Sequence, residues 1–91
     1  ETNLKVKNSQ NALQIITAHF VPLALLHDTF DGLTCEFDSW RFNLRQSHTE
    51  PCLRLNIEAK PSETHLLARR DQIISLLKDQ LISFSPNDPK D

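Results

Sequence analysis

Apolar and polar residues alternate along two neighbouring stretches of the chain, which is the pattern of strands with one buried face. The first stretch alternates Trp40, Phe42 and Leu44 with Arg41, Asn43 and Arg45, and the second alternates Leu53, Leu55 and Ile57 with Arg54, Asn56 and Glu58. Successive side chains of a strand point to opposite faces. We therefore predict a sheet with one face on a core and one face toward water or a partner.

Further strands are predicted on the N-terminal side of this pair. Residues 4–6 alternate, the segment 23–30 is largely apolar, and residues 33–37 alternate again. Asp31-Gly32, which contains the only glycine of the chain, separates the last two segments. An Asp-Gly pair between apolar runs is a strong hairpin signal, so we expect these two strands to pair.

Two other stretches have the spacing of helices. Ser9 offers a side-chain oxygen as an N-cap for the first helix, and Pro22 ends it because proline cannot continue the backbone ladder. Pro61-Ser62 opens the second helix. Its wide apolar stripe is suited to covering a sheet and consists of Leu66, Leu67, Ile73, Ile74, Leu77 and Leu81. The element order predicts an α+β fold, a mainly antiparallel sheet of four to five strands with two helices packed on one face.

The length of 91 residues corresponds to about one small domain. We expect a single domain over residues 1–84. Residues 85–91 contain two prolines and few apolar side chains, so we expect them to form a flexible tail. The chain contains no Met and does not begin with one, and we therefore expect it to be a piece of a longer protein.

Composition argues against several classes of function. The formal net charge of -2 does not fit a nucleic-acid binder, which usually has a basic face. No apolar run approaches the roughly 18 residues of a membrane span, and the polar start is not a signal peptide. Cys35 and Cys52 lack CxxC spacing, so with no export signal we expect reduced thiols and a cytoplasmic location. The four histidines are scattered without ligand spacing, so we expect no metal site.

The segment 45–51, Arg-Gln-Ser-His-Thr-Glu-Pro, is the candidate for a binding site. It connects two apolar-patterned strands, which would hold it rigidly. Arg45 offers a planar fork of donors that matches a phosphate group. Ser47 and Thr49 offer hydroxyl donors, and the backbone N–H groups of a tight turn can form an anion nest. These residues favour a doubly charged tetrahedral anion, although a solvated hairpin end would have the same composition.

The stretch 40–58, WRFNLRQSHTEPCLRLNIE, resembles the phosphate-loop region of the α-D-phosphohexomutase superfamily. That superfamily has a motif of the form R-x-S-[G/N]-T-E-P followed by a strand containing Arg. The Asp31-Gly32 hairpin upstream is similar too. The flanks W-x-F-N-L-R and L-R-L-N-x-E most resemble the bacterial phosphomannomutase branch, and the likeness extends over roughly residues 25–77.

The resemblance implies the C-terminal domain of a four-domain enzyme that interconverts hexose 6-phosphate and hexose 1-phosphate. In that family a phosphoserine of the first domain exchanges its phosphoryl group with the sugar, and a Mg²⁺ on the second domain supports the transfer. The C-terminal domain binds the phosphate that is not transferred and closes over the active site. The fragment itself would carry no catalytic residue and no cofactor, and its partners would be the hexose phosphate and the other domains.

The resemblance also assigns roles to residues of the loop. The phosphate-binding residues would be Arg45, Ser47, His48 and Thr49, and the loop-supporting residues would be Glu50, Pro51 and Arg54. Pro51 would fix the exit from the loop and bias Glu50 toward an extended conformation. His48 departs from the family, which usually has Gly or Asn there. His48 would either donate only through its backbone and point outward, or add a pH-dependent contact as a protonated imidazole.

Other polar residues leave alternatives open. Arg54 would either reach the phosphate or pair with Glu50 or Glu58 and brace the loop. Arg41 and Asn43 would face either a neighbouring domain or water. We expect Trp40 in the core and Arg69, Arg70 and Lys78 on the water side of the second helix. The alternative function is a stand-alone interaction module of the same fold that binds a protein partner through its exposed sheet face.

Overall fold

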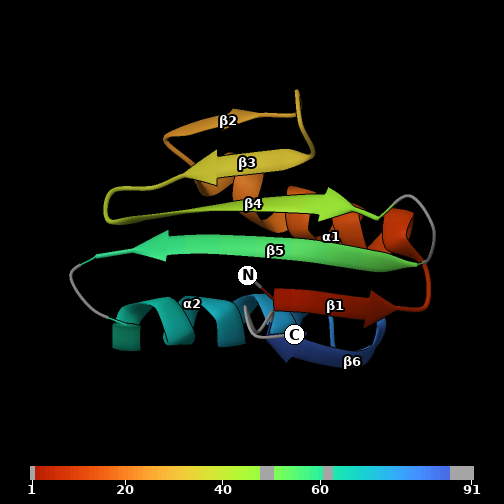
Figure 1. The fold of residues 1–91 in the computed structure, drawn as a ribbon. Helices are drawn as coiled ribbons and strands as arrows, with labels where there is room; N and C mark the ends of the chain where they lie inside the picture. Colours follow the sequence, from red (N-terminus) through yellow and green to blue (C-terminus); the bar gives the residue numbers. More distant parts are fainter. Residues whose placement is uncertain (1, 48–50, 61–62, 87–91) are drawn as a thin grey trace.

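The computed structural model describes residues 2–47, 51–60 and 63–86. Its strands are β1 (Thr2–Val6), β2 (Leu26–Asp28), β3 (Leu33–Glu36), β4 (Trp40–Gln46), β5 (Cys52–Ala59) and β6 (Leu81–Pro86). Its helices are α1 (Ser9–Phe20), the short 3-10 helix η1 (Val21–Leu23) and α2 (Glu63–Leu76). The strands form one antiparallel sheet in the order β2-β3-β4-β5-β1-β6, with α1 and α2 against one face (Figure 1). The predicted α+β fold is confirmed, with six strands rather than four to five.

The core lies between the helices and the apolar face of the sheet. Its buried members come from both helices and from the strands: Leu4, Val6, Ala12, Ile16, Phe20, Leu33, Cys35, Trp40, Phe42, Leu44, Leu53, Leu55, Ile73 and Leu77. Phe20 of α1 makes edge-to-face contacts with Trp40 and Phe42, at centroid distances of 5.7 Å and 5.2 Å. Such aromatic pairs add to the stabilisation from burial alone. The prediction that Trp40 is a core residue is confirmed.

The opposite face of the sheet carries the polar residues of the alternating pattern. Arg41, Asn43 and Arg45 on β4 lie opposite Glu58, Asn56 and Arg54 on β5. Most neighbours of these residues along the two strands are buried, namely Trp40, Phe42, Leu44, Leu53 and Leu55, so the polar set shares the face away from the helices.

The first helix begins and ends close to the predicted positions. Its N-cap is Asn8 rather than Ser9, because the Asn8 side chain accepts a hydrogen bond from the Asn11 N–H at 2.9 Å. The Ser9 hydroxyl oxygen is buried without a hydrogen-bond partner among the described residues. After Phe20 the chain tightens into η1 around Pro22, and this turn shortens the predicted strand 23–30 to the three residues of β2.

The C-terminal strand β6 is absent from the sequence prediction. Helix α2 ends at Leu76, and Leu81, expected on the helical stripe, instead begins β6 and pairs with Val6. Ser85 and Pro86, which we expected in the tail, also lie in β6. Proline is tolerated there because β6 is an edge strand. Residues 87–91, and Pro61-Ser62 at the predicted start of the second helix, lie outside the described residues.

Both cysteines are free thiols, as the sequence indicates. Burial and the nearby Asp28 carboxylate raise the pKa of Cys35 from an ordinary value of 9.0 to about 11, so this thiol is protonated at neutral pH. None of the described helices has the length and apolar character needed to cross a membrane.

Candidate functional site

Arg45 and Arg54 are brought together by the register of the two central strands. Arg45 lies near the end of β4 and Arg54 near the start of β5, and the two residues are directly opposite each other. Directly opposite side chains on one face have Cβ atoms about 4.5–5.5 Å apart, and like charges at such positions repel. This concentration of positive charge therefore costs stability, unless an anion balances it.

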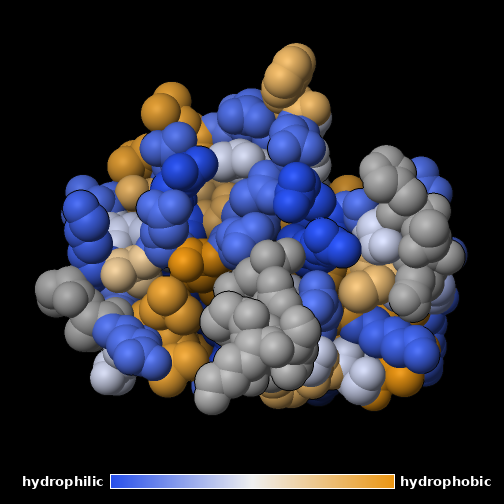
Figure 2. All heavy atoms as spheres, in the orientation of Figure 1, coloured by the Kyte–Doolittle hydropathy of each residue, from blue (hydrophilic) through white to orange (hydrophobic). Residues whose placement is uncertain are grey.

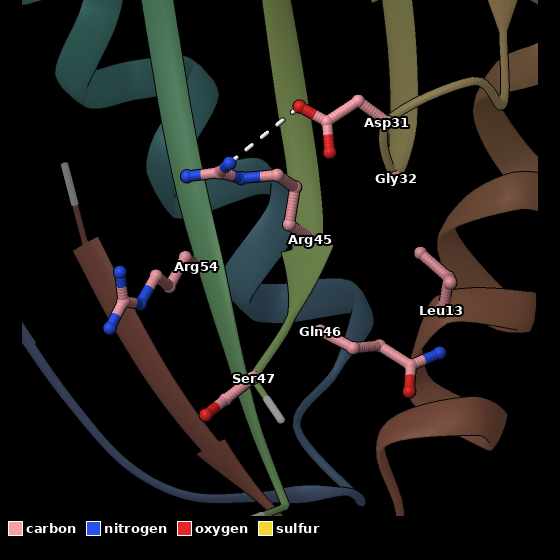
Figure 3. A pocket seen from close by; sticks show the side chains of 7 residues that line it. All are labelled: Leu13, Asp31, Gly32, Arg45, Gln46, Ser47 and Arg54. Atoms are coloured by element: carbon pink, nitrogen blue, oxygen red, sulfur yellow. Dashed lines mark ion pairs between the residues drawn. The ribbon is translucent and has the colours of Figure 1, made fainter. Parts of the chain in front are cut away.

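Asp31 lies beside this pair and partly balances it. One of its carboxylate oxygens is 3.6 Å from the Arg45 Nη1 atom (Figure 3). The Asp31 side chain is 75% exposed and the Arg45 side chain 41% exposed, so the ion pair contributes at most about 1 kcal/mol to stability. The pair therefore orients Arg45 more than it stabilises the fold.

Gly32 allows the hairpin to pack closely on β4 at this point. Its φ of 72° lies in the left-handed region, which most side chains avoid. A Cβ atom at Gly32 would lie 2.6 Å from the Leu44 carbonyl oxygen and 2.7 Å from the Arg45 Cγ atom. Only glycine fits without moving the strand that carries Arg45.

Asn43 fixes the same turn to the sheet. Its side-chain Nδ2 donates to the Asp31 carbonyl oxygen at 2.8 Å and to the Thr34 hydroxyl oxygen at 3.0 Å. The expectation that Asn43 faces either a neighbouring domain or water stays a prediction, and its amide in addition holds the hairpin in place. The sequence pattern could not show it, since the contact joins residues that are twelve positions apart.

A hollow of about 650 Å³ lies at this end of the sheet. It is lined by Leu13 of α1, by Asp31 and Gly32 of the hairpin, and by Arg45, Gln46, Ser47 and Arg54 at the base of the loop. In Figure 3 the Arg45 and Arg54 side chains lie on one side of the strands, whereas Gln46 points toward Leu13. Two guanidinium groups and one carboxylate leave the charged side chains of this lining with a net positive charge, which suits an anion.

The residues on either side of 48–50 are held by backbone hydrogen bonds. The Ser47 N–H donates to the Cys52 carbonyl oxygen at 2.8 Å, and the Val6 N–H donates to the Pro51 carbonyl oxygen at 2.9 Å. The predicted site residues His48, Thr49 and Glu50 lie outside the described residues. The structure thus brings Arg45, Ser47 and Arg54 together at one hollow. Backbone hydrogen bonds hold Ser47 and Pro51, the residues on either side of 48–50.

Arg54 was expected to brace the loop by pairing with Glu50 or Glu58, and of these two carboxylates the structure describes only Glu58. Among the residues that the structure describes, Arg54 and Glu58 form no ion pair, whereas Arg54 lines the hollow together with Arg45. Sequence reasoning missed four of the lining residues: Leu13, Asp31, Gly32 and Gln46. The Asp-Gly pair predicted the turn correctly, but the contact of Asp31 with Arg45 depends on strand register, which the sequence did not specify.

No known protein-family profile matches the chain. Individual relatives do match it. A phosphomannomutase of Escherichia coli is 42% identical over 78 residues, which are 86% of this chain and 17% of the relative. A phosphomannomutase of Vibrio cholerae serotype O1 is 36% identical over the same shares. A protein of Xanthomonas campestris pv. campestris named phosphohexose mutases is 40% identical, again over 86% of this chain.

The chain is thus similar to a domain-sized part of proteins named phosphomannomutase or phosphohexose mutases. It spans only 17% of the length of these relatives. The matches do not favour a stand-alone interaction module. They agree with the likeness in the loop sequence.

Proposed function

We propose that this chain is the phosphate-binding C-terminal domain of a phosphohexomutase, and that the parent protein interconverts hexose 6-phosphate and hexose 1-phosphate. The proposal rests above all on one observation. Arg45 and Arg54 stand opposite each other and line one hollow at the base of a loop with the sequence Arg-Gln-Ser-His-Thr-Glu-Pro. Phosphomannomutase is the name that the relatives from Escherichia coli and Vibrio cholerae carry, and it supports mannose phosphate as one substrate.

In this proposal the domain positions its ligand and carries out no chemical step. Arg45 provides a bidentate contact to the phosphate group that is not being transferred, and Arg54 adds a second positive charge. Ser47, His48 and Thr49 supply further donors, while Glu50 and Pro51 support the loop. Holding one phosphate in place orients the other for transfer, and orientation is a major part of catalysis in phosphoryl transfer.

The parent enzyme would use Mg²⁺ and would keep its metal outside this domain. Among the described residues, no three His, Cys, Asp or Glu side chains gather in a group that could hold a metal ion. The hollow is lined by two arginines and one carboxylate, and guanidinium groups bind anions such as phosphate and not metal cations. We assign no step to a metal in this chain.

Two further parts belong to the proposal. The protein would be located in the cytoplasm, and the domain would close over the bound sugar phosphate.

The isolated domain should bind phosphate weakly. Three or four charge-assisted hydrogen bonds contribute about 1.5–3 kcal/mol each, but association costs on the order of 4–15 kcal/mol. The gain and the cost are of similar size, so we expect weak binding, with a dissociation constant of about 1 mM or weaker; about 1 mM corresponds to a binding free energy of about -4 kcal/mol. The other domains of the parent would tighten binding by holding the sugar.

An amide-resolved NMR titration of the 91-residue chain tests the proposal. Inorganic phosphate and a hexose monophosphate should each give saturable shifts at residues 45–52, at Arg54 and at the Asp31-Gly32 turn. Chloride at matched ionic strength serves as the control for general salt effects. Unsaturable shifts, or shifts spread over the whole sheet, would show that the hollow is no phosphate site.

A further inference from the structure

The segment that precedes the Asp31-Gly32 turn carries a second surface, and this surface is largely apolar. Four large hydrophobic side chains within one eight-residue segment are mostly exposed: Leu23 at 63%, Leu25 at 69%, Leu26 at 65% and Phe30 at 99%. We call these four residues the β2 edge surface. Single exposed apolar residues are ordinary, but a group of them on one edge is typical of an interaction site.

The β2 edge surface follows the free edge of the sheet. Strand β2 is first in the strand order, so its outer side has no described strand beside it. In Figure 2 orange atoms stand out in two groups at the top of the molecule, with blue atoms between them, where Figure 1 places β2 and the segments on either side of it. The strand has only three residues, which limits its use as a template for another strand. Its side chains therefore have to provide most of any contact.

The charged residues around the β2 edge surface indicate what kind of partner it can bind. Residues 21–33 contain no Lys or Arg, and their ionisable side chains are His27, Asp28 and Asp31. A surface of this kind does not attract nucleic acid or anionic lipid, since both need basic residues. It fits an apolar protein surface, where the leucines and the phenylalanine would leave water.

We propose that the β2 edge surface packs against an apolar surface of another domain of the same polypeptide. This inference rests on the proposed function, in which the chain is one domain of a larger enzyme. The relatives support it, because 17% of their length is matched and the rest offers further domains to cover this edge.

The position of Phe30 connects this contact to the candidate phosphate site. Phe30 directly precedes Asp31, which pairs with Arg45. The Phe30 N–H donates to the Asp28 Oδ1 atom at 3.2 Å, so the turn that carries the exposed ring is ordered by its own hydrogen bond. A neighbouring domain that contacts Phe30 therefore lies beside the hollow, and its docking biases the turn that orients Arg45.

Hydrogen–deuterium exchange on the full parent polypeptide tests this proposal. In the wild type, peptides from residues 23–30 should exchange slowly. Their exchange rate should be the same at low and at high protein concentration. In the double variant Leu25→Ser, Leu26→Ser these peptides should exchange faster by about tenfold or more. At least one peptide outside residues 1–91 should also exchange faster, because the covering surface loses its partner.

A matched control comes from the opposite edge of the sheet. Ile82 on β6 is 56% exposed, and Ile82→Ser should change none of these peptides. The proposal is overturned if the double variant speeds exchange only within residues 23–30, since that result reflects local loosening of β2. Protection that rises with protein concentration also overturns it and indicates a second copy as the partner. The phosphate titration of the 91-residue chain is independent of these results, so it separates failure of this inference from failure of the proposed function.

Discussion

The two ends of β4 use arginine in opposite ways. At the end that begins with Trp40, Arg69 of α2 lies over the indole ring, 4.7 Å from its centroid. Its Nε donates to His65 at 3.0 Å and its Nη1 donates to Gln72 at 3.1 Å. At the other end, Arg45 has one long ion pair to an exposed carboxylate and a second arginine opposite it.

This difference separates a structural arginine from one suited to binding. The donors of Arg69 are directed to neighbours within the domain, and its planar face covers an aromatic ring, which stabilises packing. We expected Arg69, Arg70 and Lys78 on the water side of the helix. Lys78 is exposed, whereas Arg69 and Arg70 are only half-exposed, and Arg70 lies 5.7 Å from the Phe84 ring centroid. Arg45 and Arg54 instead repel each other across two strands, an arrangement that a bound anion would relieve.

The largest effect should come from the packed core that supports both ends. Phe42→Ala removes a ring that is 1% exposed and contacts Phe20, so it should lower the free energy of unfolding by about 3–5 kcal/mol. Arg45→Ala, on the open face of the same strand, should cost less than about 1 kcal/mol. Denaturant melts of both variants measure the contrast, and similar losses would mean that Arg45 is structural.

The next effect is a loss of stability at alkaline pH. The pKa of Cys35 is raised by burial and by Asp28 to about 11. The folded state therefore holds the thiol proton more tightly than the unfolded chain. This stabilisation is complete below pH 9.0 and is lost as the pH rises toward 11, by about 2–3 kcal/mol in all. Melts from pH 8 to about 11 should show a smaller decline in Cys35→Ala than in the wild type. Parallel declines would exclude Cys35 as the cause.

Gly32→Ala should have an intermediate effect that reaches the candidate site. The new Cβ would meet the Leu44 carbonyl oxygen and Arg45 Cγ at a positive φ, which costs about 1–3 kcal/mol in strain. Chemical shifts of Arg45 and its neighbours should move, and phosphate affinity should fall. Leu33→Ala is a suitable comparison because it perturbs the adjacent core residue. Loss of stability with unchanged phosphate affinity would show that the turn does not position Arg45.

The smallest predicted effect concerns Asp31. Asp31→Asn keeps the backbone carbonyl that accepts from Asn43 but removes a negative charge from the hollow. Phosphate binding should strengthen by roughly two- to fivefold at low salt, because an exposed ion pair is worth little and like charges repel. A phosphate titration at low and at high salt measures this. Weaker binding in Asp31→Asn would mean that the orientation of Arg45 outweighs the repulsion.

The sequence predicted the parts of the fold that follow from local patterns. The alternation in β4 and β5 identified the buried face, and Asp31-Gly32 identified the hairpin. Strand β6 was missed because its Ser-Phe-Ser-Pro sequence has a weak pattern and owes its place to pairing with β1. The pairing of Asp31 with Arg45 and the position of Arg54 in the hollow depend on register between strands, so local patterns could not predict them.

The most direct test compares the arginines at the two ends of β4. Phosphate affinity should be measured by NMR titration for Arg45→Gln and Arg69→Gln, which remove the same charge from one fold. Arg45→Gln should lose at least about tenfold in affinity, equivalent to about 1.4 kcal/mol, while Arg69→Gln should bind phosphate as the wild type does. Equal affinity in the two variants, or a larger loss in Arg69→Gln, would contradict a phosphate site at the Arg45 end.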